Sequence, residues 1–356
     1  MTDMMKTALL YGPSDVRIVD APKPTAGPGM VLIRVKLCMT AGTTVKQYFR
    51  GYPGWGYPHG FGYEWAGEIE EVGENVDKTL IGKNVIGDNS KRSCSCFFCV
   101  RGKPNLCANW ARRREKPETD DPKIGKISGM YVEYAIIPQA NLRILPEHLS
   151  PEDACMVPTI TVAQHGNNNV KVEEGDTVAV IGAGAIGLSH MMLSHLRGAQ
   201  TIAIDMNSSR LDFAKKIGAA DLTIQTGDTK EAQKRIEELN INEGWGPDVT
   251  IEAVGLPRTW EMAFDLVRRG GQVLEYGGCE PGTTITLDTY KLHYHEITVV
   301  SSTTASPIDS IRAYNLVERG MIKPSVFITD RIPMTRIKEA LELHRTGKGL
   351  KYAVIP

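Results

Sequence analysis

Apolar and polar positions alternate along the first part of the chain in the way that β-strands require. Segments 5–11 and 30–37 alternate in this manner, and residues 68–72 and 84–87 give shorter strand patterns. Prolines and glycines between residues 22 and 29 separate the first two segments and predict a turn there. To about residue 150, the chain is therefore expected to be rich in strands and loops.

The pattern changes after Pro151, where buried-type apolar strands begin to alternate with helical segments. Strands buried on both faces read as nearly continuous apolar runs, and their alternation with helices predicts a parallel sheet covered on both sides. From about residue 300 the pattern returns to mixed helix and strand segments. The alternating elements are strands 177–181, 201–204, 249–252 and 272–276 and helices 185–197, 210–217 and 259–268.

Composition fits a soluble enzyme of about two domains rather than a membrane or nucleic-acid protein. Hydrophobic residues make up 42% of the 356 positions and charged residues 23%, and the formal net charge is −1. This charge provides no basic field for nucleic acid or an anionic membrane. The first residues, Met1 to Lys6, lack the apolar core of a signal peptide, and we expect a cytoplasmic protein with a small-molecule substrate.

A glycine-rich turn between an apolar strand and an apolar helix predicts a dinucleotide site. The run from Val178 to Gly187 fits strand, G-x-G-x-x-G, helix, and Asp205 ends the next strand about 20 residues later. The Asp205 carboxylate would bind both ribose hydroxyls and repel a 2′-phosphate, which favours NAD over NADP. A structural turn without a ligand is the alternative. The predicted cofactor-binding residues are Gly182, Gly184, Ala185, Ile186, Gly187, Asp205, Arg210, Val254 and Gly255.

Nearly the whole chain resembles the medium-chain dehydrogenase/reductase family, which contains the zinc alcohol, sorbitol and threonine dehydrogenases. The resemblance implies an α/β protein with two domains and an active site in the cleft between them. A β-rich, GroES-like catalytic domain would span 1–158 and take up 300–356, and an NAD-binding Rossmann domain would span 159–299. It also implies a homo-oligomer, either a dimer or a tetramer. The matching segments begin at Val31, Trp65, Gly129, Val178, Ile251 and Gly347.

Four of the seven cysteines lie between residues 94 and 107 and resemble the family's structural-zinc lobe. The family pattern is C-x2-C-x2-C-x7-C, but its first position here is Ser93, and Cys94 follows it. Four thiolates on one short loop suit a tetrahedral zinc, and clustering without a secretion signal favours metal over disulfides. One structural zinc held by Cys94, Cys96, Cys99 and Cys107 is therefore expected, with free thiols of a degenerate site as the alternative.

The family's catalytic zinc ligands are replaced in this chain. Where relatives carry a Cys, a His and a later Cys or Glu, this sequence carries Ala41, Tyr63 and, approximately, Val157 or Thr159. Neither alanine nor a neutral tyrosine can replace a thiolate or imidazole on zinc. A site rebuilt from other residues is the alternative, namely Cys38, His59, Glu64 and His165.

Without the metal, hydride transfer needs a proton donor or a hydrogen-bonding group for the substrate oxygen. Tyr63 with a nearby Lys46 is the first candidate, because an ammonium lowers the pKa of a phenol beside it. Thr43, Glu64 and His165 are further catalytic candidates, while Tyr63 as a mere space filler is the alternative. Candidate pocket walls are Tyr48, Tyr52, Trp55 and Tyr57.

The expected activity is NAD(H)-dependent hydride transfer to or from an alcohol, polyol or sugar-like carbonyl, without a catalytic zinc. Three other functions stay open. Zinc-free members of the family often reduce an activated C=C bond, although they usually lack the cysteine lobe. The enzyme could also recycle NAD internally during an epimerisation or elimination, or the chain could be a non-enzymatic NAD(H) sensor.

Overall fold

The computed structural model divides the chain into two compact units, which we describe separately. Unit 1 comprises Met1–Pro158 and Ser306–Pro356, and unit 2 comprises Thr159–Ala305. The structure describes residues 3–51, 56–88, 94–109 and 129–356. Tyr52 and Trp55, two of the candidate pocket walls, lie outside the described residues.

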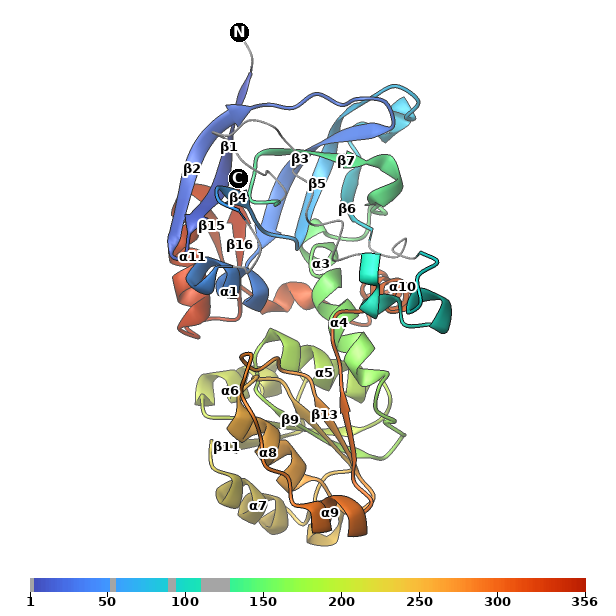
Figure 1. Ribbon diagram of the computed structural model, residues 1–356, viewed down its shortest axis with the longest axis vertical. Helices are drawn as coiled ribbons and strands as arrows, with labels where there is room; N and C mark the ends of the chain where they lie inside the picture. Colours follow the sequence, from blue (N-terminus) through green and yellow to red (C-terminus); the bar gives the residue numbers. More distant parts are fainter. Residues whose placement is uncertain (1–2, 52–55, 89–93, 110–128) are drawn as a thin grey trace. The chain divides into compact units, whose positions relative to one another are not determined.

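Unit 1 is built on two sheets that are antiparallel except for the parallel pair β15–β16 (Figure 1). The larger has the order β15-β16-β3-β5-β6-β8, with β7 paired to β3, and the smaller has the order β2-β1-β4. Alternating apolar side chains of these strands meet in one core that includes Val31, Ile33, Ile69 and Tyr131. The strands are β1 (Met4–Gly12), β2 (Asp15–Pro22), β3 (Met30–Met39), β4 (His59–Gly60), β5 (Trp65–Val72), β6 (Asn84–Gly87), β7 (Tyr134–Pro138), β8 (Leu142–Ile144), β15 (Ile328–Pro333) and β16 (Lys351–Ile355).

The last strand of the chain, β16, completes the larger sheet by pairing with β3. Ala353 pairs with Met39 and Val354 with Cys38, so the end of β3 lies beside a segment more than 300 positions later. The helices of this unit are short, and α1 contacts α11. Their bounds are α1 (Gly42–Arg50), α3 (Pro151–Ala154), α10 (Pro307–Glu318) and α11 (Ile337–Arg345), and α4 (Val157–Asn167) leads into unit 2.

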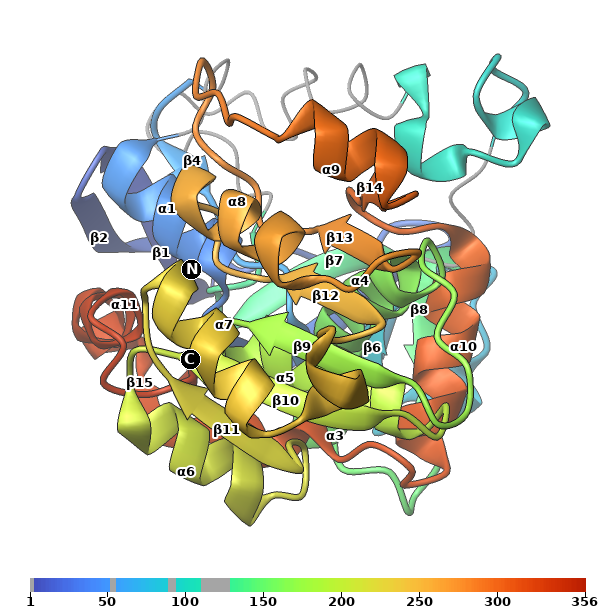
Figure 2. The same cartoon turned by 90° about the horizontal axis from the view of Figure 1, so that it is seen from below.

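Unit 2 is a six-stranded parallel sheet with the order β11-β10-β9-β12-β13-β14. Helices α7 and α8 share one apolar core with Ala179 and Ile181 of β9, and α5 packs against the other face, where Gly187 approaches Val180 (Figure 2). The elements are β9 (Thr177–Ile181), α5 (Ala185–His195), β10 (Gln200–Asp205), α6 (Ser208–Lys216), β11 (Leu222–Gln225), α7 (Thr229–Glu238), β12 (Val249–Glu252), α8 (Pro257–Leu266), β13 (Gln272–Glu275), α9 (Thr289–Tyr294) and β14 (Thr298–Ser301).

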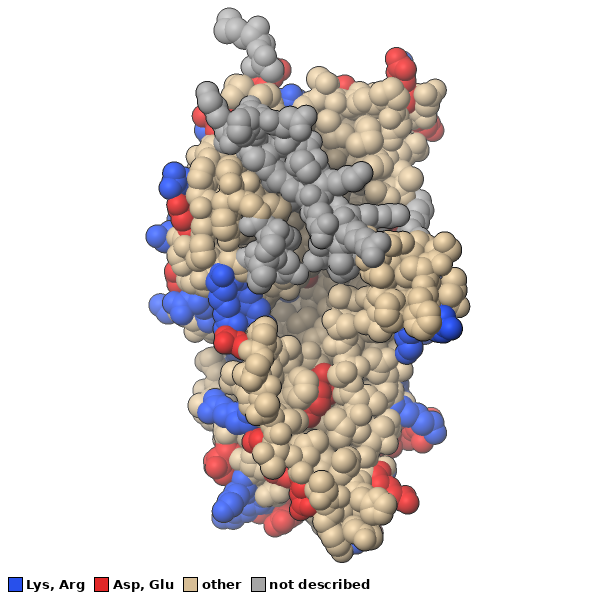
Figure 3. Space-filling model, viewed as in Figure 1, with Lys and Arg blue, Asp and Glu red and all other residues tan. Residues whose placement is uncertain are grey.

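The predicted α/β architecture is confirmed, with a β-rich unit and a doubly wound parallel sheet. Lysine and arginine are interspersed with aspartate and glutamate on the face shown in Figure 3, as the net charge of −1 leads one to expect. Within the described residues, no helix has both the length and the apolar character that crossing a membrane requires.

Candidate active site and metal lobe

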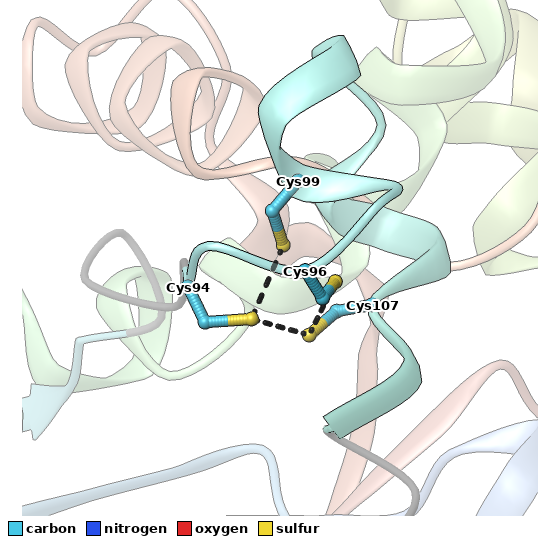
Figure 4. Close-up of side chains that lie close together, drawn as sticks. All are labelled: Cys94, Cys96, Cys99 and Cys107. Atoms are coloured by element: carbon cyan, nitrogen blue, oxygen red, sulfur yellow. Dashed lines mark hydrogen bonds between the residues drawn. The ribbon is translucent and has the colours of Figure 1, made fainter.

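The four predicted lobe cysteines converge in unit 1 (Figure 4). Cys94 Sγ lies 3.7 Å from Cys99 Sγ and 3.4 Å from Cys107 Sγ, and Cys96 Sγ lies 3.9 Å from Cys107 Sγ. Sulfurs on a tetrahedral zinc with bonds of about 2.3 Å would be about 3.8 Å apart. The donor set and its spacing therefore fit zinc, and Cys94 belongs to the set despite its one-residue displacement.

Backbone amides around this loop favour the thiolate form of two of its cysteines. A backbone hydrogen bond from Cys96 lowers the pKa of Cys94, and one from Cys99 lowers the pKa of Cys96 to about 6. Asn109 Nδ2 also donates to Cys94 Sγ over 3.5 Å. Because a thiolate and not a thiol is the metal ligand, these donors favour ligation by Cys94 and Cys96, whereas burial and the neighbouring thiols raise the pKa of Cys99 to about 12.

The glycine turn of unit 2 has the geometry that the dinucleotide fingerprint requires. Gly182 has φ 99°, and a Cβ on Gly187 would lie 1.8 Å from the Gly182 carbonyl oxygen, so helix α5 packs directly on the turn. Gly184 is the N-cap of α5, and a Cβ there would meet nothing within 4 Å. The helix N-terminus is therefore open to an approaching pyrophosphate, which its dipole and free N–H groups favour.

Asp205 ends β10 beside this turn and is oriented by two backbone donors. Its Oδ2 accepts from Ala183 N at 2.8 Å, its Oδ1 accepts from Asn207 N at 2.8 Å, and Arg210 Nη1 lies 3.8 Å from Oδ2. Each carboxylate oxygen can accept more than one hydrogen bond, so the group can still receive ribose hydroxyls. The other predicted cofactor residues are in the same unit: Ala185 and Ile186 begin α5, and Val254 and Gly255 follow β12.

A buried ion pair lies where the catalytic zinc ligands would gather in unit 1. Lys351 Nζ of β16 donates to Glu64 Oε2, and the two side chains are only 4% and 3% exposed. Lys351 Nζ also lies 3.3 Å from the Thr40 carbonyl oxygen. Sequence reasoning missed Lys351 as a site residue, although it ends the matching segment that begins at Gly347.

Tyr63 precedes Glu64 and Ala41 follows Thr40, but neither residue offers a metal ligand of the kind it replaces. Ala41 is 3% exposed and is the N-cap of α1, where Thr44 Oγ1 donates to its carbonyl at 2.8 Å. Tyr63, in the loop between β4 and β5, is 44% exposed. The site thus combines a closed apolar wall at Ala41 with an accessible phenol at Tyr63.

Three further titratable groups lie close enough to Glu64 to feel its charge, of which Tyr131 and Cys155 were not pointed to by the sequence, whereas Cys38 was named in the alternative metal site. The Tyr131 hydroxyl donates to the Met39 carbonyl at 2.8 Å, and burial raises the pKa of Tyr131 well above its usual value. Burial likewise raises the pKa of the Cys38 and Cys155 thiols, and the Glu64 charge adds to this effect. All three are therefore neutral at physiological pH, and Glu64 lies among buried, uncharged groups.

The remaining predicted site residues are spread over both units. Thr43 and Lys46 are exposed on α1 of unit 1, and His165 is partly buried on α4 of unit 2. Tyr48 does not form a pocket wall: it is fully buried and its hydroxyl donates to the Ser14 carbonyl. Among the described residues, the lobe cysteines form the one cluster of three or more side chains that could hold a metal ion.

A GroES-like sheet, a glycine turn after β9 and an acidic residue ending β10 define a dehydrogenase scaffold, and comparison with known proteins agrees. The family model described as alcohol dehydrogenase GroES-like domain matches residues 27–147. The model described as zinc-binding dehydrogenase matches residues 185–319.

Curated relatives and solved structures align over almost the full length. D-arabinitol dehydrogenase 1 of Uromyces fabae is 31% identical over 98% of this chain and 97% of its own, and sorbitol dehydrogenase of Bombyx mori is 30% identical over the same shares. A zinc-binding dehydrogenase from Sinorhizobium meliloti bound to NADP has a TM-score of 0.84 at 25% identity, covering 99% and 100%. An Escherichia coli alcohol dehydrogenase with NADH has a TM-score of 0.81 at 26% identity, covering 99% of both chains.

The chain belongs to the zinc-type medium-chain dehydrogenase/reductase family. It is an oxidoreductase of the alcohol and polyol dehydrogenase class. The resemblance found in the sequence and the predicted enzyme class are thereby confirmed.

Proposed function

We propose that this protein transfers hydride between NAD(H) and an alcohol, polyol or sugar-like carbonyl without a catalytic zinc. The observation that carries the proposal is the pairing of an intact dinucleotide turn with a pocket in which Ala41 and Tyr63 replace two metal ligands. D-arabinitol and sorbitol dehydrogenases among the relatives support a polyhydroxylated substrate.

In this proposal the cysteine lobe holds one structural zinc. The four sulfurs lie within 4.8 Å of one another, and four thiolates leave no coordination position for substrate. Such a zinc would stabilise the lobe and take no part in hydride transfer. The protein would accordingly carry one metal per chain, whereas a relative with both sites filled would carry two.

Tyr63 is the proposed proton donor and acceptor. A dinucleotide held by the Gly182–Gly187 turn and Asp205 would supply the hydride acceptor or donor. In oxidation the Tyr63 phenolate would take the alcohol proton, and in reduction the Tyr63 phenol would give its proton to the carbonyl oxygen and become the phenolate. Thr43, with an exposed hydroxyl at the start of α1, would hydrogen-bond the same substrate oxygen. Lys46 would lower the pKa of the phenol by its charge.

In this proposal Glu64 does not contact the substrate and does not act as its base. Glu64 is 2% exposed and its carboxylate accepts from Lys351, so its negative charge is neutralised in the interior of unit 1. This arrangement supports a positioning role for Glu64 and leaves the accessible Tyr63 phenol as the group that meets the substrate.

The runner-up is reduction of an activated C=C bond, which needs weaker stabilisation of oxygen charge. Retention of the four-cysteine lobe argues against it, because zinc-free C=C reductases of the family usually lack that lobe. Internal recycling of NAD during an epimerisation or elimination is the third possibility, and a non-enzymatic NAD(H)-binding role is the last.

A metal count combined with a substrate screen tests the proposal. Purified protein should contain about one zinc per chain and should change absorbance at 340 nm with a polyol and NAD. Two zincs per chain, with one contacting Glu64, would overturn the zinc-free pocket. Turnover of an enone but of no alcohol would favour the C=C reductase, and product formation without net absorbance change would favour internal recycling.

The choice of NAD over NADP is tested through Asp205. The Asp205→Ala variant should lose roughly 1.5–3 kcal/mol of NADH binding, the range of charge-assisted hydrogen bonds, and much of the preference over NADPH. Asp212→Ala, which removes a carboxylate from α6, serves as the control. Unchanged cofactor preference in Asp205→Ala would remove this part of the proposal.

A further inference from the structure

The carboxylate of Glu252, the last residue of β12, accepts hydrogen bonds from two loops of unit 2. Its Oε1 accepts from Val254 N and Gly255 N, each at 2.8 Å, and from Thr259 Oγ1 at 2.7 Å. Its Oε2 accepts from Gly277 N at 3.1 Å. The loop after β12 and the loop after β13 therefore share one buried anchor.

These two loops border the part of the sheet that the nicotinamide half of a dinucleotide would occupy. The strand order reverses between β9 and β12, and dinucleotides bind across the carboxyl ends of the strands at such a point. The glycine turn follows β9 and Asp205 ends β10, so those strands take the adenosine half. A Cβ on Gly182 would lie 2.8 Å from Val254, so the anchored loop also contacts the glycine turn.

A second buried carboxyl lies beside Glu252 on the neighbouring strand. Glu275 of β13 pairs in register with Glu252, so the two side chains leave the same face of the sheet. Glu275 is 3% exposed, and neither of its carboxyl oxygens has a hydrogen-bond partner among the described residues. Two carboxylates in such a place repel each other unless one of them holds a proton.

Among the described residues, no cation adds to the effects of burial and of Glu252 on Glu275. Burial, with the Glu252 charge second, raises the pKa of Glu275 to about 8. Burial also raises the pKa of Glu252, but hydrogen bonds from Thr259, Gly255, Val254 and Gly277 lower it in part. Strands β9 and β14 carry no titratable side chain. The charged groups of α8 and α9 contact other partners: Arg258 contacts Met206, and Glu261 accepts from Thr286 N. Lys291 donates to the carbonyls of Phe264 and Asp265 and lies 3.7 Å from the Asp265 carboxylate.

We propose that Glu252 and Glu275 form a proton-dependent clamp that holds the nicotinamide side of the cofactor site in its binding geometry. With Glu275 protonated, Glu252 keeps its negative charge and its backbone donors, and the two loops stay joined. When Glu275 loses its proton, repulsion between adjacent carboxylates strains the anchor and the loops separate. Both residues are positioning residues, since they act on the cofactor through Val254, Gly255 and Gly277.

The direction of the pH effect follows from the raised pKa of Glu275. A carboxyl that holds its proton more tightly in the folded state contributes most stability below its unfolded value of 4.5, and the contribution is lost as pH rises toward about 8. Thermal stability of the cofactor-free protein should therefore fall between pH 6 and pH 8. Cofactor affinity should fall across the same group's ionisation, around pH 8.

The test compares the full-length wild type with Glu275→Gln, which is neutral at every pH and nearly the same shape. NADH binding is measured by fluorescence titration from pH 6 to 9.5, and unfolding of the cofactor-free protein is followed over the same range. Wild-type Kd should rise by up to about tenfold from pH 7 to 9. Loss of one proton can change Kd by at most about tenfold per pH unit, so this value allows for a partial effect. Glu275→Gln should bind NADH as tightly at pH 7 and stay nearly constant. Glu261→Gln on α8 is the matched control.

Because the inference rests on the proposed NAD(H) binding, the two readouts separate its failure from failure of that proposal. NADH binding at pH 7 with the same pH profile in wild type and Glu275→Gln would overturn the clamp alone. No NADH binding at any pH would overturn the cofactor assignment and the clamp's role in binding. The same pH dependence of unfolding in wild type and Glu275→Gln would overturn the titration of Glu275. If Glu275→Gln does not fold, Glu275→Met supplies a neutral side chain of similar volume, and the same flat profile is expected.

Discussion

Two regions of unit 1 correspond to metal sites in the zinc-type family, and they differ in what they have kept. The cysteine lobe keeps four sulfurs within 4.8 Å of one another, although one cysteine is displaced by a residue. The pocket around Ala41 and Tyr63 keeps only Glu64, which is bound to Lys351. The ligands of a structural zinc and those of a catalytic zinc can therefore be replaced independently, and each region has to be judged from its own residues.

Among the variants that test this difference between the two regions, Tyr63→Phe should have the largest effect. If the phenol transfers the proton, kcat should fall by ~10²–10⁴-fold, the usual scale for general acid–base catalysis, with little change in NADH affinity. Tyr134→Phe on β7 makes the same chemical change beside Arg34 and should leave kcat unaltered. Steady-state kinetics of both variants gives the comparison.

Normal turnover by Tyr63→Phe would reduce Tyr63 to a residue that fills the space of the missing metal. The proton role would then pass to Thr43, Glu64 or His165, to be tested in that order. A shift of one limb of the pH–rate profile in Lys46→Met would show that the ammonium tunes the catalytic group, and an unchanged profile would remove Lys46 from the mechanism.

Lys351→Met tests whether the pocket floor now depends on an internal ion pair in place of a metal. Removing one partner of a buried pair leaves an uncompensated charge and costs about 3–5 kcal/mol in unfolding free energy. The double variant Glu64→Gln, Lys351→Met should recover much of that loss, because neither charge is then buried alone. Urea unfolding measures both, and equal stability of the two variants would contradict coupling between the residues.

Cys99→Ser tests the metal lobe, where we expect loss of zinc and of local stability with little loss of chemistry. Zinc content should fall from about one per chain to near zero, since removing one of four thiolates opens a structural site. Cys279→Ser changes a cysteine outside the lobe and should keep the metal. A loss of kcat in Cys99→Ser at full NADH binding and unchanged stability would mean that the lobe takes part in catalysis.

The variant with the smallest expected effect on the structure restores the family's catalytic zinc ligands. The triple variant Ala41→Cys, Tyr63→His, Val157→Glu supplies a thiolate, an imidazole and a carboxylate, and zinc should rise from about one to about two per chain. Metal analysis before and after dialysis against a weak chelator checks this. A count that stays at one would show that the pocket has changed in shape as well as in ligands.

The parallel sheet of unit 2 was predictable because each of its main strands is buried on both faces and reads as an apolar run. Strand β9 was predicted at 177–181 and occupies Thr177–Ile181. Helix α1 was not predicted, because its N-cap, Ala41, has no side-chain acceptor to mark the start. Helix α8 was placed two residues too late because Pro257, which suits the first turn of a helix, was not used as a start signal.

Only part of the candidate site could be predicted from the sequence, because some of its contacts leave a local pattern and others do not. The glycine turn, Asp205 and the cysteine spacing are local patterns, and their residues meet because the chain is short between them. The partnership of Glu64 with Lys351 spans 287 positions, and the pairing of Glu252 with Glu275 depends on strand register. Neither leaves a periodic signal, so only three-dimensional structure shows that these charges face one another.

The distance along the chain between Glu64 and Lys351 also matters during synthesis. Strand β3 and the loop that carries Glu64 leave the ribosome long before β16, and all of unit 2 is made in between. Until the lysine arrives, burying Glu64 would place a carboxylate in an apolar interior without a counter-charge. The pocket of unit 1 should therefore stay open to water in the nascent chain and close late, which makes the half-made protein a natural client for chaperones that protect exposed apolar surface.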